Sequence, residues 1–190
     1  SSVSMNDSGD IIAIGAYGNF GSGFESGHAR VYSWNGASWI QLGSDIDGEA
    51  AGDRSGISSI NAVGNRIAIG SGGNDGNGSG SGHVRIYDWN GSSWVQQSQV
   101  IQGESAYDNC SETSMNASGT IMSVGAAGND GNGQNSGQIR VFTCNTSIVD
   151  SLTACDSLTW INGNTYTSSN FGDSYILGSN YKGCDSIKYL

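Results

Sequence analysis

The fold is decided by the stretch Ile12-Ala13-Ile14-Gly15, because the chain repeats it at a fixed interval. It returns as Ile67-Ala68-Ile69-Gly70 and, with substitutions, as Met122-Ser123-Val124-Gly125. From position 12 to 67, and again from 67 to 122, the step is 55 residues. A short apolar run is typical of a strand buried on both faces, and the closing glycine indicates a bend or a close approach of another backbone.

The rest of each unit follows the same step without an insertion or deletion. Ser26-Gly27-His28 maps to Ser81-Gly82-His83, and Trp34-Asn35-Gly36 maps to Trp89-Asn90-Gly91. The third unit has Cys144-Asn145-Thr146 in place of the Trp-Asn-Gly element, so it is incomplete. A period near this length indicates propeller blades or solenoid coils.

Within one unit the pattern predicts four strands. In the first unit these are Ser4-Met5, Ile11 to Ala16, Ala29 to Trp34 and Ser38 to Leu42. Asn35-Gly36 joins the last two, and Asn-Gly favours a type I′ hairpin turn because both central residues need positive φ. We therefore predict an all-β fold of consecutive four-stranded antiparallel propeller-type blades, followed by a small disulfide-linked β tail.

The repeat also predicts the domain organisation of the 190 residues. Residues 1–145 are expected to form three propeller-type repeats at about 1–55, 56–110 and 111–145, the last incomplete. Residues 146–190 are expected to form a small cysteine-containing β module. The length suits one ordinary domain, but the repeat indicates a section of a larger assembly. The 31 glycines then mark repeated turns rather than flexibility.

Charge and cysteine content narrow the function classes. Seven Lys and Arg against seventeen Asp and Glu give a net charge of -10, which disfavours binding to nucleic acid or to anionic lipid. The longest apolar runs fit strands, so membrane insertion is not expected. Four cysteines without a CxxC pair favour disulfides and an oxidising compartment, the alternative being four free buried thiols. Four cysteines allow three disulfide connectivities. The sequence at the N-terminus indicates either that a signal peptide has been removed or that the chain is cut from a longer one.

These motifs carry a family resemblance over about residues 1 to 145. Ile-Ala-Ile-Gly-Ala from Ile12, Ser-Gly-His-Ala-Arg-Val-Tyr from Ser26 and the inter-unit stretch from Asp47 to Gly56 resemble FG-GAP-type repeats, the blades of integrin alpha-like β-propellers. The resemblance implies propeller blades and does not imply catalysis. Such propellers usually have about seven blades, more than this chain holds. The loop that binds calcium in integrins keeps carboxylates only in the first unit, at Asp7 and Asp10.

The tail resembles a C-terminal module common in secreted surface proteins of Bacteroidetes. The residues that carry it run from Ala154 to Trp160 and from Gly183 to Ile187. The resemblance implies a disulfide between Cys155 and Cys184, which leaves Cys110 and Cys144 as the other pair. Asp-Ser followed by an aliphatic residue, at Asp150, Asp156 and Asp185, is similar to the O-glycosylation signal of that phylum, with unmodified surface serines as the alternative.

Calcium is the one cofactor that the residues suggest. The loops between the second and third strands offer six candidate ligands: Asn74, Asp75, Asn77, Asn129, Asp130 and Asn132. Closely spaced oxygens around a turn glycine can hold this hard cation. Each loop has only one carboxylate, however, and the first unit has Asn19-Phe20-Gly21-Ser22 with none. We favour the alternative, in which Asn and Asp side chains form Asx turns.

Recurring polar residues suggest further sites with simpler alternatives. Glu49 and Asp53 recur as Glu104 and Asp108, and paired carboxylates can serve as a general acid and base. Because they recur once per unit, we favour loop hydrogen bonds and blade contacts. His28 and His83 could bind a transition metal. They stand at equivalent positions of the repeat, however, and Gln138 takes that position in the third unit, which favours a polar structural role. The recurring arginines are expected to pair with a neighbouring acidic loop: Arg30, Arg85 and Arg140.

Four tryptophans flank the Asn-Gly hairpins: Trp34, Trp39, Trp89 and Trp94. Exposed aromatics at hairpin tips can stack on sugars, whereas a cross-strand aromatic pair would only stabilise each hairpin. We favour the cross-strand pair because it follows from the turn register.

Together these features predict a non-catalytic secreted or cell-surface repeat protein, acting in adhesion or as a subunit of an extracellular assembly or filament. Its expected partners are other copies of itself or the missing blades of a larger chain, since an open stack leaves sheet faces uncovered. The alternative is a carbohydrate-binding lectin that uses the hairpin tryptophans. A glycoside hydrolase or lyase using Glu49 or Glu104 is the weakest hypothesis.

Overall fold

A computed structural model describes residues 1–143, 158–159, 165–166, 174–176 and 187–189. It divides into two compact units, Ser1–Thr143 and Cys144–Leu190. In the second unit the described strands form two separate antiparallel pairs, β13 (Leu158–Thr159) with β14 (Thr165–Tyr166) and β15 (Ser174–Ile176) with β16 (Ile187–Tyr189). No helix among the described residues is long and apolar enough to cross a membrane.

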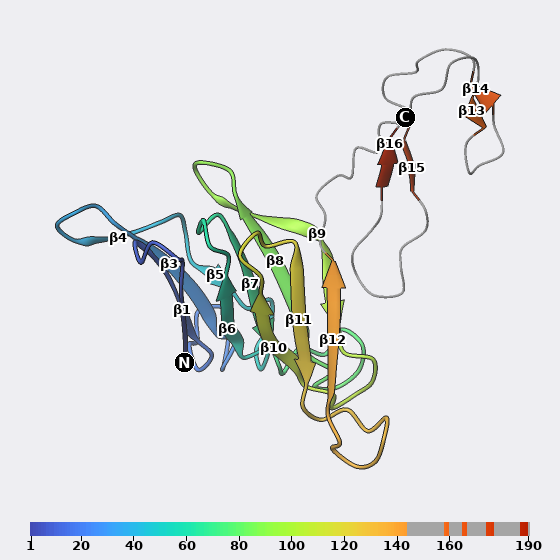
Figure 1. The fold of residues 1–190 in the computed structure, drawn as a ribbon. Helices are drawn as coiled ribbons and strands as arrows, with labels where there is room; N and C mark the ends of the chain where they lie inside the picture. The colour runs from blue at the N-terminus through green and yellow to red at the C-terminus, as the bar shows by residue number, and fades with distance from the viewer. Residues whose placement is uncertain (144–157, 160–164, 167–173, 177–186, 190) are drawn as a thin grey trace. The chain divides into compact units, whose positions relative to one another are not determined.

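The first unit consists of three antiparallel sheets in chain order (Figure 1). The first blade contains β1 (Ser2–Met5), β2 (Ile11–Ala16), β3 (His28–Trp34), β4 (Trp39–Gln41) and β5 (Ile46–Asp47). The second contains β6 (Ser55–Ile60), β7 (Arg66–Ser71), β8 (His83–Trp89) and β9 (Trp94–Gln102). The third contains β10 (Cys110–Met115), β11 (Ile121–Ala126) and β12 (Gln138–Thr143).

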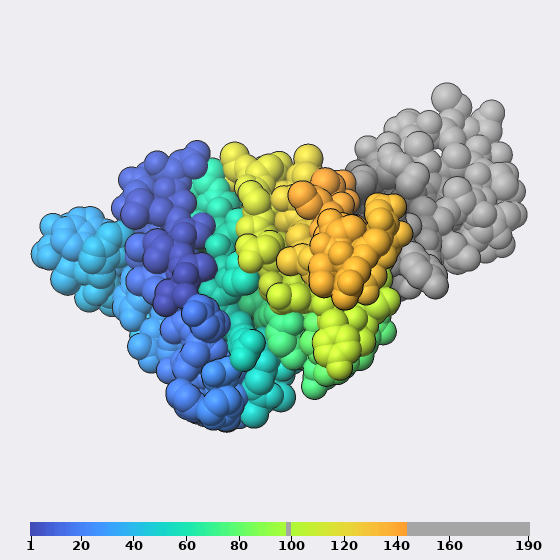
Figure 2. Space-filling model, turned by 90° about the horizontal axis from the view of Figure 1, so that it is seen from below, coloured from blue at the N-terminus to red at the C-terminus, as the bar shows by residue number. Residues whose placement is uncertain are grey.

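Each sheet is an up-and-down meander in which sequential strands are neighbours, except that β5 of the first blade pairs with β3. This is the topology of a propeller blade. The blades follow one another in order of colour across the face shown in Figure 2. The part of the chain that the structure describes is therefore all-β and built of consecutive propeller-type blades, as the sequence predicted. The fourth strand of the first blade differs, because Gly43 adopts a φ of 79° and separates β4 from β5. The second blade has Ser98 at that step, and β9 runs through it.

The turn before each buried strand depends on one asparagine. The Asn61 side-chain oxygen accepts hydrogen bonds from the backbone N–H groups of Gly64, Asn65 and Arg66 at 3.0 Å. Asn6 and Asn116 likewise accept from the first residue of the following strand, at 2.9 Å in both cases. These side chains satisfy backbone donors that the strand ladder leaves unpaired. The turn before each buried strand is thus closed by the protein's own side chains.

Each blade has two faces, which are named here by their neighbours. The leading face is the one that the second and third blades turn toward the blade before them. In the first blade the equivalent face carries Met5, Ile12 and Tyr32, which lie opposite one another on adjacent strands. The trailing face points toward the following blade and carries Ser4, Ala13 and Val31. One core lies between the trailing face of the first blade and the leading face of the second, and its buried members are Ala13, Ala29, Val31, Ile46, Ile60, Ile67, Ile69 and Tyr87.

A glycine on each trailing face lets the next blade approach. A Cβ on Gly15 would collide with the carbonyl oxygen of Gly56, and one on Gly70 would collide with that of Ser111. Gly56 and Ser111 lie at register irregularities near the start of β6 and β10, where a bulge moves one residue out of the ladder. The glycine that ends the repeated motif is therefore required by close backbone approach between blades.

Candidate functional site

The arginines that recur in the third strand join one blade to the next. Arg85 donates to the backbone carbonyl of Asp47 at 2.8 Å and lies 3.5 Å from the Glu49 carboxylate. One blade later the same contacts join Arg140 to the Gln102 carbonyl at 2.6 Å and to the Glu104 carboxylate at 3.4 Å. Both arginine side chains are largely buried, and the preceding blade supplies the partners of their terminal nitrogens. The Nε atom of each has no hydrogen-bond partner among the residues that the structure describes. The expected pairing with a neighbouring acidic loop holds for these two arginines.

The recurring aspartates hold the inter-blade loops. The buried Asp53 carboxylate accepts hydrogen bonds from the backbone N–H groups of Glu49 and Ala50 at 2.9 and 3.0 Å. Asp108 does the same for Glu104 and Ser105 at 2.8 and 3.1 Å. These carboxylates therefore shape a loop through charge-assisted hydrogen bonds. This is the structural role that their recurrence favoured over general acid–base chemistry.

Arg30 breaks this pattern. Its guanidinium donates three hydrogen bonds of 2.7 to 3.0 Å to Asp45 of its own blade, and Gln41 donates a further one at 2.7 Å. The hydrogen bond from Arg30 is the main reason that the pKa of Asp45 lies below its ordinary value. The second blade has Val100 at the step of Asp45, so this pair belongs to the first blade.

The same corner of the first blade contains a possible metal-binding group. His28 Nδ1 lies 3.6 Å from an Asp45 oxygen and 4.0 Å from an Asp47 oxygen, and all three ligand atoms lie within 4.8 Å of one another. One imidazole nitrogen and two carboxylates are a donor set that zinc accepts. Arg30 already donates to the Asp45 carboxylate, however, so this group is joined by contacts among the blade's own side chains. Sequence reasoning considered His28 with His83, and the structure instead places His28 beside two aspartates.

His83, at the same step in the second blade, is buried. Burial is the main cause that lowers its pKa, and Arg85 adds to the effect. Its Nε2 has no hydrogen-bond partner among the residues that the structure describes. The positions opposite the histidine in the first blade, Asp45 and Asp47, are Val100 and Gln102 here. The second blade therefore repeats the histidine without its carboxylates.

The four tryptophans form two cross-strand pairs. The ring centroids of Trp34 and Trp39 are 5.5 Å apart, and those of Trp89 and Trp94 are 5.3 Å apart, both pairs tilted by about the same angle. The second pair packs against Gly43 of the first blade, and Trp94 Nε1 donates to the Leu42 carbonyl at 2.9 Å. Trp89 and Trp94 therefore belong to a blade contact, whereas Trp34 and Trp39 are exposed. Glycan binding by these residues stays a prediction.

In the second blade the Asn-Asp-Gly loop is held by its own side chains, with an Asx turn at Asn74. Asn74 Oδ1 accepts from the N–H of Gly76 at 2.9 Å, and Asp75 Oδ1 accepts from the N–H of Gly80 at 2.7 Å. The Asn77 amide donates to the carbonyls of Gly103 and Glu104. In the third blade Asn129 and Asp130 accept from Gly131 and Asn135 in the same way. The candidate oxygens thus serve the backbone, and calcium binding by these loops, Asn132 included, stays a prediction.

Sequence reasoning missed a cleft of about 430 Å³ at the loop end of the blades. Its walls include Tyr17, Arg54, Tyr107, Asn109 and Glu112, drawn from all three blades. Both tyrosines are exposed and can stack on a ligand, and the volume lies in the range of small-molecule sites. Arg54, Tyr107 and Asn109 have positive φ, but Arg54 and Asn109 stand one step apart, so this conformation belongs to the repeat.

The cysteine predictions fall largely on residues outside the description. Cys110 is buried and forms no disulfide with another described residue, and burial is the main cause that raises the pKa of its thiol. Its expected partner Cys144 lies outside the described residues, as do Cys155 and Cys184 and the three Asp-Ser motifs at Asp150, Asp156 and Asp185. The predicted disulfides and glycosylation therefore stay predictions.

Comparisons with known proteins add little to this description. No protein-family model matches the sequence, and a search of curated proteins gives no match. Among solved structures the chain is similar to TolB from Acinetobacter baumannii, with a TM-score of 0.43 and 10% sequence identity. The match covers 98% of this chain and 45% of that chain, so the chain spans less than half the length of the solved relative. The fold assignment rests on the strand order and register described above.

Proposed function

We propose that the chain is a non-catalytic, secreted or cell-surface repeat protein that acts in adhesion or as a subunit of an extracellular assembly or filament. One observation carries the proposal: the recurring polar and aromatic residues bind one blade to the next. Arg85, Asp53 and Trp94 each make such a contact or hold the loop that makes it. A unit whose distinctive residues serve stacking is suited to building an extended surface.

The resemblances support the extracellular part of the proposal. The repeats resemble FG-GAP-type propeller repeats, and the tail resembles a secreted module of Bacteroidetes, with its Cys155–Cys184 pair implied. A net charge of -10 and the absence of Pro-rich or basic segments suit a soluble surface protein rather than a nucleic-acid partner. Disulfides would be stable in that compartment.

The mass of the native particle tests the assembly role. Sedimentation velocity from about 1 µM to about 100 µM should show species heavier than the 19.6 kDa chain, in proportions that rise with concentration. A single 19.6 kDa species at every concentration would contradict the assembly role. Disulfide mapping by mass spectrometry under non-reducing conditions tests the compartment separately, since free thiols at all four cysteines would count against secretion.

Glycan binding is the second candidate function, favoured by the cleft and by the exposed first hairpin. Tyr17 and Tyr107 line the cleft, and Trp34 and Trp39 are exposed together on one hairpin. A glycan array probed with the wild-type protein tests this directly. Loss of binding in Trp39→Ala would assign the hairpin, and loss in Tyr107→Ala would assign the cleft. If the wild-type protein bound no glycan, this candidate would be rejected.

A further inference from the structure

The glycine and arginine contacts between blades recur at both junctions, and they indicate what an end face needs. The Ser2 hydroxyl contacts the backbone of Gly56 and Ser58, and Ser4 accepts from the N–H of Ile60 at 3.1 Å. Gly15 leaves room for the bulged residue of the next blade, as Gly70 does one step later. The leading face of the second blade is closed by apolar residues that lie in the core. The serine contacts belong to the first junction, because Ile57 stands at the step of Ser2, whereas the glycine contact recurs and is expected of any sheet that continues the stack.

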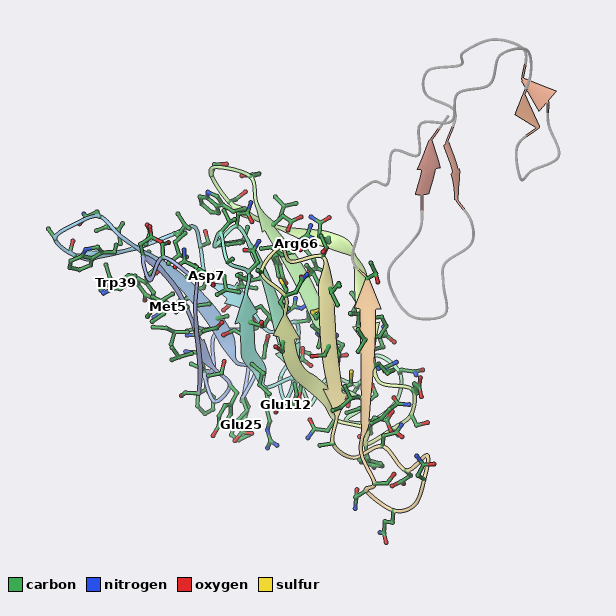
Figure 3. All side chains as sticks on the ribbon, in the orientation of Figure 1. Met5, Asp7, Glu25, Trp39, Arg66 and Glu112 are labelled. Atoms are coloured by element: carbon green, nitrogen blue, oxygen red, sulfur yellow. The ribbon has the colours of Figure 1, made fainter. Side chains whose placement is uncertain are left out.

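The leading face of the first blade carries the same kinds of residue without a cover. Val3 and Met5 are 64% and 51% exposed, and they stand one step before Ser58 and Ile60, which are buried. Ile14, Trp34 and Trp39 are also exposed, whereas Ile69 one step later is fully buried. Met5 and Trp39 project from the outer side of the first blade in Figure 3. This is the surface that a preceding blade covers elsewhere in the stack.

The trailing face of the third blade is its counterpart. Ile139 and Val141 are 77% and 66% exposed, at the steps of Val84 and Ile86, which are buried. Gly125 keeps the glycine of Gly15 and Gly70, but a Cβ there would meet only the Glu112 side chain, at 3.1 Å. Among the described residues, the space that the other two glycines leave for a bulged backbone holds only the flexible Glu112 side chain beside Gly125. The bulged residues that fill this space in the other blades, Gly56 and Ser111, are 55 residues apart, and the residue 55 positions before Gly56 is Ser1.

The leading face of the first blade does not depend on an acidic residue from a preceding blade. Arg85 and Arg140 each pair with a glutamate of the preceding blade, Glu49 and Glu104. The residue 55 positions after Glu104 is Thr159, so the third blade is not followed by an equivalent glutamate. Arg30 does not need it, because Asp45 of its own blade already holds the guanidinium. Contact between the third and first blades would therefore leave no buried arginine without a carboxylate.

We propose that a second copy of this chain docks its first-blade leading face on the third-blade trailing face, continuing the stack head to tail. This inference rests on the proposed assembly role and names its partner and its surfaces. The contact is heterologous, since two different faces meet. Such contacts close into a ring where the rotation allows it and otherwise extend into a filament.

Two face-specific double variants test the proposal. Val3→Asp with Met5→Asp blocks the leading face, and Ile139→Asp with Val141→Asp blocks the trailing face. All four positions are exposed, so folding should be kept, which circular dichroism and the melting temperature check. Val63→Asp is the matched control, because Val63 is 67% exposed in the turn between β6 and β7, away from both faces.

Sedimentation velocity of each variant alone and of the mixtures gives the answer. Each double variant should remain a monomer at concentrations where the wild type and Val63→Asp assemble, a weakening of more than about tenfold. An equimolar mixture of the two double variants should form a dimer and stop there, because each supplies one intact face. If only the leading-face variant lost assembly, or if both assembled like the wild type, the head-to-tail contact would be overturned while the assembly role stood. A wild type that stays monomeric would overturn both.

Discussion

The first and second blades share their strand sequences but not their surroundings. Ile14 and Ile69 occupy the same place in the same repeated motif, yet Ile14 is 37% exposed and Ile69 is 0% exposed. Arg30 and Arg85 are likewise equivalent, but one is held by its own blade and the other by its neighbour. The comparison teaches that local sequence determines the strand, and position in the stack determines what each side chain contributes.

The largest expected difference lies at the trailing-face glycines. Gly70→Ala should destabilise the protein by about 3 kcal/mol, because the new Cβ collides with the Ser111 carbonyl and the blades must separate. Gly125→Ala should cost less than about 1 kcal/mol, since its Cβ meets only a flexible glutamate side chain. Urea denaturation of dilute protein measures both. Equal losses would show that the glycine serves the strand itself and not the blade contact.

A smaller difference is expected for the shared isoleucine. Ile69→Ala should cost about 3 kcal/mol, because it opens a cavity in the core between the first two blades. Ile14→Ala should cost about 1 kcal/mol or less, because the side chain is already partly in water. The same denaturation experiment measures both. A comparable cost for Ile14→Ala would mean that the leading face is covered in solution.

Substitutions of the hairpin tryptophans should differ less in their effect on stability. Trp94→Phe removes the donor to the Leu42 carbonyl and should cost about 1 kcal/mol. Trp39→Phe keeps an aromatic partner for Trp34 and should leave the melting temperature within about 1 °C of wild type. Differential scanning calorimetry resolves the two. If the order were reversed, Trp39 rather than Trp94 would be the tryptophan in a structural contact.

The smallest effect concerns the Arg30–Asp45 pair of the first blade. The pKa of Asp45 is lowered in the folded state, so the pair adds stability above the unfolded value of about 3.9 and loses it as the pH falls through the folded value. Arg30→Gln should raise the pKa of Asp45 toward that value and reduce the acid sensitivity of the first blade. Carboxyl chemical shifts followed by NMR between about pH 2 and 6 would check this. An unchanged pKa would assign the shift to Gln41 and His28 instead.

The features that the sequence predicted are local or strictly periodic. The buried strand and the Asn35-Gly36 hairpin need only a few neighbouring residues, and the repeat confirms them by recurrence. The pairing of Arg85 with a neighbouring acidic loop was expected because the arginine recurs in step, and the structure places Glu49 of that loop 3.5 Å away. Arg30 could not be predicted in the same way, because its pairing with Asp45 depends on a position that the other repeats do not share.

The cleft lay beyond sequence reasoning for another reason. Tyr17, Arg54 and Tyr107 come from different blades and occupy different steps of the repeat, so no periodic pattern joins them. Only the stacking of blades brings them to one wall. The sequence could not decide whether the side-chain oxygens of Asn74 and Asp75 bind their own backbone or a calcium ion, since the same oxygens suit both.

The glycine at the end of each buried strand has a consequence for how such a gene can change. Because Gly15 and Gly70 receive a residue at the same offset along the chain, a duplicated segment of 55 residues would arrive with this blade contact already in register. A duplication one residue longer or shorter would place a side chain where the bulged backbone must lie. The 55-residue spacing therefore favours duplications of whole blades over duplications of part of a blade.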